Sequence, residues 1–302
     1  MFTESIVRVY ADPVVELFVA STAGPAERTL LVIHGGPDWD HSYLREPLCE
    51  LGDRYRLLLP DLRGCGRSTR GLSGDQYTWD AVVADLLALL DVTSTGTVDV
   101  LGFSTGGLIA QRLTLAAPHR VRRLVIASSS VPPVPPDAFD GWAERDQRHA
   151  AGVALGPDPT GLSGPALTRA WALNSAPANL WRAEALPDYL RRLDAVRFSA
   201  DWAGPWQAGT LPSARPADPL RRLSVLGIPV LLLHGREDMT FPAQLAHDAA
   251  THIPSARAVV LDEAGHMAHI DQPHRWLTAL AEFLHQPVHA IRPGAPGPAD
   301  PP

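Results

Sequence analysis

Short apolar runs of strand length recur along the chain and alternate with longer amphipathic segments. The first clear run is Thr29–Ile33, which ends in Gly35-Gly36. It is continuously apolar, a pattern typical of a strand buried on both faces in a parallel sheet. Runs of this kind predict strands at 29–33, 56–59, 98–101, 123–127, 229–233 and 258–261.

The segments around these runs complete the prediction of an α/β fold. Residues 5–10 and 14–20 are expected to form an extended pair, because Ala11-Asp12-Pro13 between them has turn chemistry. Helices are predicted at 78–90, where Thr78 is a suitable N-cap, at 108–117 and at 273–284. Strands alternating with helices favour a mainly parallel central sheet flanked by helices.

One long region interrupts this alternation. Residues 132–222 contain no apolar strand run, but hold thirteen of the 29 prolines and five of the eight tryptophans. Prolines at that density limit helices to short pieces. We therefore expect a helical cap at 132–222, inserted into a core formed by 1–131 and 223–285. The proline-rich residues 286–302 are predicted to be a disordered tail.

Composition narrows the classes of partner. The 302 residues are 45% hydrophobic and 20% charged, as in a globular enzyme, and the net charge is −7. Without a basic face, binding to nucleic acid is not expected. No apolar run reaches the length of about 18 residues needed to span a membrane, and the first residues lack the pattern of a signal peptide, which predicts a cytoplasmic protein. Cys49 and Cys65 are too few for a disulfide framework.

The strongest chemical motif is Gly102-Phe-Ser104-Thr-Gly106, a G-x-S-x-G sequence between a predicted strand and a predicted helix. In this motif the serine lies on a strained turn with positive φ, and glycines two residues away leave the space that the turn needs. The N-terminus of the following helix favours negative charge at the serine oxygen. Ser104 is therefore the candidate nucleophile, with Gly102 and Gly106 shaping its turn.

A second glycine motif, His34-Gly35-Gly36-Pro37, follows the first predicted parallel strand. This is where such a fold places a donor to the oxyanion. Because Pro37 has no N–H, we expect the backbone N–H groups of Gly36 and Thr105 to form the oxyanion hole.

A serine nucleophile needs a base and an orienting acid. Asp238 and His266 each follow a predicted buried strand, and the order Ser104, Asp238, His266 is the one that this fold uses. Glu237 is an alternative acid. His269 is an alternative histidine, either packed on a helix face or paired with His266 at a metal. Since no further residue completes a ligand set, no metal site is expected.

Taken together, these motifs resemble those of the α/β-hydrolase superfamily, from about residue 6 to residue 284. The motifs 34–37, 61–68 and 235–238 are most similar to the branch of proline iminopeptidases and related esterases. The resemblance implies an α/β-hydrolase fold, with Ser104 as nucleophile, Asp238 as acid, His266 as base and no cofactor. Phe103, Thr105 and Asp38 depart from the residues usual in iminopeptidases.

Three functional hypotheses remain open. The first is a serine hydrolase that cleaves an ester, a lactone or a related acyl bond of a small apolar substrate. The second is an aminopeptidase acting on a short peptide, whose ammonium group would be held by Glu184 or Asp201. The third is an acyltransferase, a cyclase or a non-catalytic binder on the same fold. Candidate substrate-binding residues are Trp181, Trp202 and Trp206, and the oligomeric state is left open.

Overall fold

The computed structural model describes residues 1–286, so the predicted tail lies outside the described residues apart from Gln286. In the described part, no helix is long and apolar enough to cross a membrane. The strands are β1 (Thr3–Ala11), β2 (Val14–Ser21), β3 (Thr29–Ile33), β4 (Arg56–Pro60), β5 (Val98–Phe103), β6 (Val121–Ala127), β7 (Val230–Gly235) and β8 (Ala256–Leu261).

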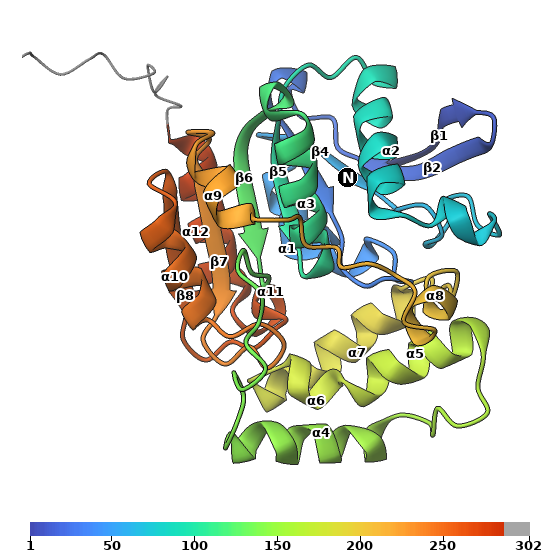
Figure 1. Cartoon of the computed structure of the whole chain (residues 1–302), viewed down its shortest axis with the longest axis vertical. Coiled ribbons are helices and arrows are strands. Elements are labelled where there is room, and N and C mark those ends of the chain that lie inside the picture. Colours follow the sequence, from blue (N-terminus) through green and yellow to red (C-terminus); the bar gives the residue numbers. More distant parts are fainter. Residues whose placement is uncertain (287–302) are drawn as a thin grey trace, which may run out of the picture.

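These strands form one sheet in the order β1-β2-β4-β3-β5-β6-β7-β8. β1 pairs with β2, and β2 with β4, in antiparallel fashion, whereas all the later pairs are parallel. The prediction of a mainly parallel sheet in an α/β fold is therefore confirmed. Because β3, β5, β6, β7 and β8 run in one direction, the loops that follow them meet at one edge of the sheet (Figure 1).

Helices connect and cover the strands. The α-helices are α1 (Arg45–Leu48), α2 (Trp79–Val92), α3 (Thr105–Ala116), α4 (Ala143–Leu155), α5 (Gly164–Asn174), α6 (Ala176–Asn179), α7 (Leu186–Ala195), α8 (Ala203–Gln207), α9 (Pro219–Ser224), α10 (Gln244–His252), α11 (Ala268–Asp271) and α12 (Pro273–His285). Short 3-10 helices lie at Ala26–Arg28, Ser42–Leu44, Cys49–Leu51, Gly74–Gln76, Pro118–Arg120 and Ala183–Ala185.

The continuous apolar runs are explained by a core on each face of the sheet. In β3, Leu31 and Ile33 pack into one cluster together with residues of α2 and α3. Leu30 and Val32 face the opposite way, into a cluster with residues of α12. Because successive side chains of a strand point to opposite faces, both alternating sets must be apolar when helices cover both sides.

Helix α3 begins three residues earlier than the sequence pattern indicates, at Thr105 and not at residue 108. The intervening Gly106 and Gly107 suggest a turn because glycine is a poor helix former. In the structure, a Cβ at Gly106 would lie only 2.2 Å from the carbonyl oxygen of Ile33. The glycine therefore allows the start of α3 to approach β3, and this close contact outweighs its low helix propensity.

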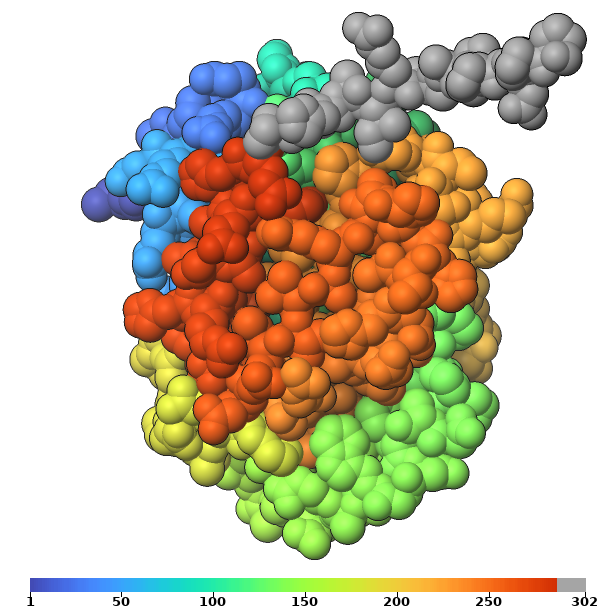
Figure 2. Space-filling model, turned by 90° about the vertical axis from the view of Figure 1, so that its left-hand side faces the viewer, coloured from blue at the N-terminus to red at the C-terminus, as the bar shows by residue number. Residues whose placement is uncertain are grey.

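The stretch 132–222 contains helices α4–α9 and no strand. We call α4–α8 the cap helices, because they lie together beyond the edge where the parallel strands end (Figure 1). In the side view of Figure 2, the atoms of α4 (light green) and α7 (yellow) lie at the bottom of the molecule, next to the C-terminal strands and helices (orange to red). Helix α9 instead packs against α3 and α10, beside the sheet.

Candidate active site

Ser104 lies on a tight turn between β5 and α3. Its backbone has a φ of 56° and a ψ of −124°, an unusual conformation for a residue other than glycine. A Cβ at Gly102 would lie 2.2 Å from the carbonyl oxygen of Gly106, so a side chain at 102 would collide with the start of α3. The turn places Ser104 at the N-terminus of a 12-residue helix, where partial positive charge favours an anionic oxygen.

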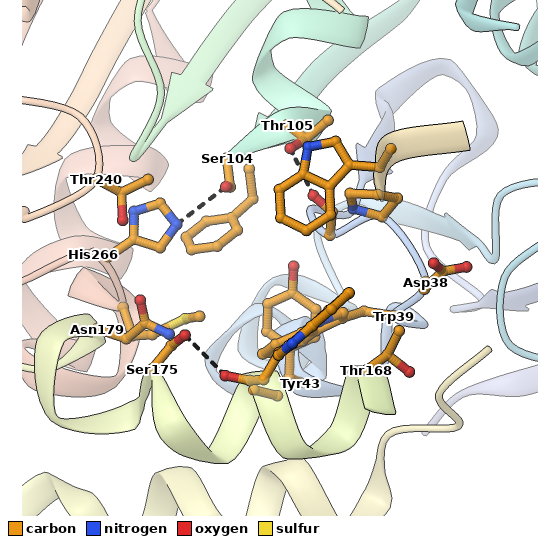
Figure 3. Close-up of a pocket in the computed structure, with 17 residues that line it drawn as sticks. Asp38, Trp39, Tyr43, Ser104, Thr105, Thr168, Ser175, Asn179, Thr240 and His266 are labelled. Atoms are coloured by element: carbon orange, nitrogen blue, oxygen red, sulfur yellow. Dashed lines mark hydrogen bonds between the residues drawn. The ribbon is translucent and has the colours of Figure 1, made fainter. Parts of the chain in front are cut away.

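Three side chains from three separate loops form one hydrogen-bonded row. The Nε2 atom of His266 lies 3.0 Å from the hydroxyl oxygen of Ser104 (Figure 3). The Nδ1 atom of His266 lies 3.0 and 3.1 Å from the two carboxylate oxygens of Asp238. If Nδ1 carries the proton and donates it to Asp238, Nε2 is left as an acceptor for the serine hydroxyl. This tautomer is the one required of a general base.

Asp238 is completely buried, yet its surroundings favour the ionised form. Burial alone raises the pKa of a carboxyl group, but the charge of His266 and hydrogen bonds from His234 and His266 outweigh burial and hold the pKa of Asp238 well below its usual range. The backbone N–H groups of Thr240 and Phe241 also donate to Oδ1, at 2.8 and 2.9 Å. A permanently ionised carboxylate is suited to stabilise a cationic imidazole.

His234 is a supporting residue that the sequence analysis missed. It is the penultimate residue of β7 and is fully buried. Its Nε2 atom lies 2.7 Å from the carbonyl oxygen of Phe241 and 3.2 Å from Oδ2 of Asp238. Its position four residues before Asp238 was the only signal in the sequence, and that spacing acquires meaning only once the loop is known to fold back on the strand.

The alternative acid and the alternative histidine lie elsewhere. The Glu237 carboxylate accepts a hydrogen bond from the backbone N–H of Ala264, at 3.0 Å. His269 is fully buried among aromatic rings, with centroid separations of 5.0 Å to Phe103 and 6.0 Å to Tyr43. Burial, together with the nearby Arg192 charge, lowers the pKa of His269 well below its usual value, which favours a neutral ring packed in the core.

The loop that follows β3 brings Gly36 to the same place. His34 is buried, and because its Nε2 accepts the backbone N–H of Leu62 at 3.0 Å, its Nδ1–H is free to donate to the Gly35 carbonyl oxygen at 2.7 Å. The Gly35 N–H in turn donates to the hydroxyl of Tyr43 at 2.8 Å. Gly36 and Thr105, the two residues expected to supply the oxyanion hole, both line the pocket around Ser104.

A pocket of about 370 Å³ opens in front of Ser104 and His266 (Figure 3). Its walls combine Trp39 and Tyr43, from the segment after β3, and Phe103, the last residue of β5, with side chains of the cap helices. The cap contributes Thr168, Trp171, Ala172, Ser175, Asn179 and Trp206.

Charge is scarce in this pocket. Within residues 1–286, the lining holds one carboxylate, that of Asp38, and one histidine, His266. Its Oδ1 accepts hydrogen bonds from the Ser199 hydroxyl and the backbone N–H of Trp202, both at 3.1 Å.

Comparison with known proteins places this arrangement in a family. The profile of the family described as alpha/beta hydrolase fold matches residues 28–273. The chain belongs to this family. It is accordingly a hydrolase of ester or related bonds in the α/β-hydrolase superfamily, and the resemblance noted from its motifs is confirmed.

Individual relatives of this α/β-hydrolase cover almost its whole length. It is 29% identical over 302 residues to rhodomycin D methylesterase from Streptomyces peucetius, covering 94% of this chain and 95% of the relative. It is 27% identical to the proline iminopeptidase of Levilactobacillus brevis, covering 84% and 87%. The solved structure of a proline iminopeptidase-related protein from Thermus thermophilus superposes with a TM-score of 0.70 at 24% identity, over 94% and 97% of the two chains.

The predicted substrate-binding tryptophans of the hydrolase do not all face the pocket. Trp206 lines it and is 58% exposed, in edge-to-face contact with Trp171. Trp202 lies outside the lining, because its indole stacks on Trp79 and donates to the carbonyl oxygen of Arg63. Trp181 also lies outside it, against the Arg148 guanidinium. Trp39 and Trp171 line the pocket in place of Trp181 and Trp202. No motif in the sequence distinguishes them from the other tryptophans.

The two carboxylates considered as ammonium ligands also lie away from the lining. Glu184 is exposed and pairs with Arg182 at 2.7 Å. Asp201 accepts hydrogen bonds from the Tyr77 hydroxyl, at 2.5 Å, and from the Gly71 N–H, at 2.6 Å. Both are therefore engaged in structural contacts.

Proposed function

We propose that this protein is a serine hydrolase that cleaves a carboxylic ester or a related acyl bond through an acyl-enzyme on Ser104. The observation that carries the proposal is the row Ser104–His266–Asp238, with 3.0 Å separating the hydroxyl from Nε2 and 3.0 Å separating Nδ1 from the nearer carboxylate oxygen. Both lengths are those of ordinary hydrogen bonds, so the base is already in contact with the nucleophile.

The reaction follows from the role of each group. His266 accepts the hydroxyl proton as the Ser104 oxygen attacks the carbonyl carbon, and the ionised Asp238 stabilises the resulting imidazolium. The backbone N–H groups of Gly36 and Thr105 stabilise the negative oxygen of the tetrahedral intermediate. His266 then protonates the departing alcohol, which leaves the acyl group on Ser104. In the second half, His266 takes a proton from water as the water attacks the acyl-enzyme, and returns that proton to the Ser104 oxygen as the acid is released.

The pocket indicates the kind of substrate. Its walls are formed largely by Trp39, Tyr43, Phe103, Trp171 and Trp206, and its volume of about 370 Å³ suits a molecule of modest size. Among the described residues that line it there is no arginine or lysine, so an anionic substrate group would be desolvated there without a guanidinium or ammonium partner. We therefore propose a neutral substrate with an aromatic or apolar group.

The same pocket does not favour an aminopeptidase. An N-terminal ammonium needs an ionised, accessible carboxylate, whereas the one in the described lining, Asp38, is almost fully buried and burial raises its pKa. The likeness to proline iminopeptidases therefore extends to the fold and the proposed triad, whereas the substrate is proposed to be different.

Ser104→Ala tests the mechanism. Turnover of neutral p-nitrophenyl and naphthyl esters is expected to fall by a factor of about 10⁴ or more, because the nucleophile is lost. A fluorophosphonate should add its mass to the wild-type protein and to Ser224→Ala, a matched control outside the pocket, and not to Ser104→Ala. Full labelling of Ser104→Ala would contradict the proposal. Turnover of prolyl-naphthylamide would favour the aminopeptidase, and transfer of the acyl group to an added alcohol would favour an acyltransferase.

A further inference from the structure

The two halves of the proposed oxyanion hole belong to segments that are distant in sequence. Gly36 lies in the loop after β3, and Thr105 is the first residue of α3, 69 residues later. An oxyanion hole is effective only when its donors are already oriented before charge develops. A direct connection between these two segments is therefore of functional interest.

The Thr105 side chain makes such a connection. Its hydroxyl donates a hydrogen bond of 2.7 Å to the carbonyl oxygen of Gly36 (Figure 3). One residue thus contributes its backbone N–H to the proposed hole and uses its side chain to hold the residue that contributes the other N–H.

Gly36 is the part of this loop that most needs an external contact. Its φ of +119° lies in a region open to glycine, and glycine is the residue with the greatest backbone freedom. The peptide unit that carries the Gly36 N–H also carries the Gly35 carbonyl, which accepts a hydrogen bond from His34, and the Gly35 N–H is held by Tyr43. The Gly36 carbonyl belongs to the next peptide unit, which ends at Pro37 and has no N–H of its own. The Thr105 hydroxyl fixes that unit relative to α3.

We propose that the Thr105 hydroxyl is a positioning group of the oxyanion hole: it holds Gly36 against α3 from the carbonyl side and so, together with the His34 bond on the other side, places the Gly36 N–H relative to Ser104. This inference rests on the proposed serine mechanism and adds a role for a side chain that the triad does not use. Because the oxyanion exists only in the transition state and the intermediate, loss of this contact lowers kcat and leaves KM almost unchanged.

Thr105→Val and Thr105→Ser separate the hydroxyl from the bulk of the side chain. With p-nitrophenyl esters, Thr105→Val is expected to lower kcat about 10- to 100-fold, less than the full loss of an oxyanion donor. Thr105→Ser keeps the hydroxyl and is expected to stay within about threefold of the wild type. The matched control is Thr114→Val in the same helix, where the hydroxyl bonds to the Ala110 carbonyl oxygen at 2.8 Å, away from the pocket. This control is expected to leave kcat unchanged.

A second readout examines the oxyanion itself. A thionoester places the developing charge on sulfur, a weak hydrogen-bond acceptor, so it draws less stabilisation from the hole than the corresponding ester. The preference for ester over thionoester should therefore shrink in Thr105→Val and persist in Thr105→Ser and Thr114→Val. Thr105→Ala serves as the second hydroxyl-free variant if Thr105→Val does not fold, as judged by circular dichroism.

Three results would overturn the proposal: equal kcat in Thr105→Val and the wild type, equal damage in Thr105→Ser and Thr105→Val, or a change confined to KM. Failure of the serine mechanism is seen separately. In that case Ser104→Ala retains turnover, and fluorophosphonate does not label the otherwise unaltered protein.

Discussion

Two regions around the site depend on buried carboxylates, and they use them in opposite ways. The loop after β7 carries Asp238, which faces two histidines. At the contacts between the core and the cap helices, Asp38 and Asp271 face hydrogen-bond donors that are mostly neutral. All three side chains are almost fully buried. What differs is the charge of their partners.

The difference appears in the pKa values. Burial raises the pKa of Asp38, even though Trp202 and Ser199 donate hydrogen bonds to it. Burial likewise raises the pKa of Asp271, against the N–H groups of Trp181 and Gly265. At Asp238, by contrast, the histidines reverse the effect of burial and lower the pKa. Neutral donors can satisfy a buried carboxylate, but of these three only the one that faces histidines has its ionised form strongly stabilised.

The contrast has a structural meaning. Asp271 accepts the N–H of Trp181 at 2.9 Å and that of Gly265, the residue before His266, at 2.8 Å. Asp38 accepts hydrogen bonds from Ser199 and Trp202, in the segment that leads into α8. Helix α8 in turn carries the pocket residue Trp206. These two carboxylates therefore connect the pocket wall to the core by accepting hydrogen bonds, whereas Asp238 acts through its charge.

The largest expected effect comes from removing that charge. Asp238→Asn keeps the size of the side chain but removes its charge and can leave His266 in the wrong tautomer, so kcat is expected to fall about 10⁴-fold. Steady-state kinetics on a neutral ester measures this change. The matched control is Glu237→Gln, where the amide oxygen can still accept the Ala264 N–H. If the two variants lost activity equally, the assignment of the acid to Asp238 would be wrong.

A smaller effect, on stability, is expected from Asp38→Ala. The substitution leaves the Ser199 hydroxyl and the Trp202 N–H buried without their acceptor, which should lower the free energy of unfolding by about 2–3 kcal/mol. Asp38→Asn keeps an oxygen for both donors and should stay within about 1 kcal/mol of the wild type. Urea unfolding measures both. Equal destabilisation by alanine and asparagine would mean that the charge of Asp38, and not its geometry, holds this contact.

The same contrast explains how much the sequence could predict. Ser104, Asp238 and His266 each follow a strand whose apolar run is easily recognised, and parallel strands bring the ends of those runs to one edge. Asp38 could be noticed only as a departure from a motif, because its partner Ser199 lies 161 residues away and no local pattern connects them. Trp202 and Trp206 looked alike in sequence, but one is 1% exposed and the other 58%. In a region of short, proline-limited helices, no periodicity indicates which side chain faces inward.

The smallest predicted effect is the most specific, because the two regions should differ in its sign. The folded-state pKa of Asp238 is lowered, so its contribution to stability is present above the unfolded pKa of about 3.9 and is lost as pH falls toward the folded pKa. The folded-state pKa of Asp38 is raised, so the folded protein binds the proton first and gains stability as pH falls through that pKa. Urea unfolding of the wild type, Asp238→Asn and Asp38→Asn between about pH 7 and pH 2, a range that includes the window below the unfolded pKa of Asp238, measures both contributions. As pH falls, the stability of the wild type relative to Asp238→Asn should decrease, and its stability relative to Asp38→Asn should increase. Slopes of the same sign would show that the partners of these carboxylates do not control their charge in the way proposed.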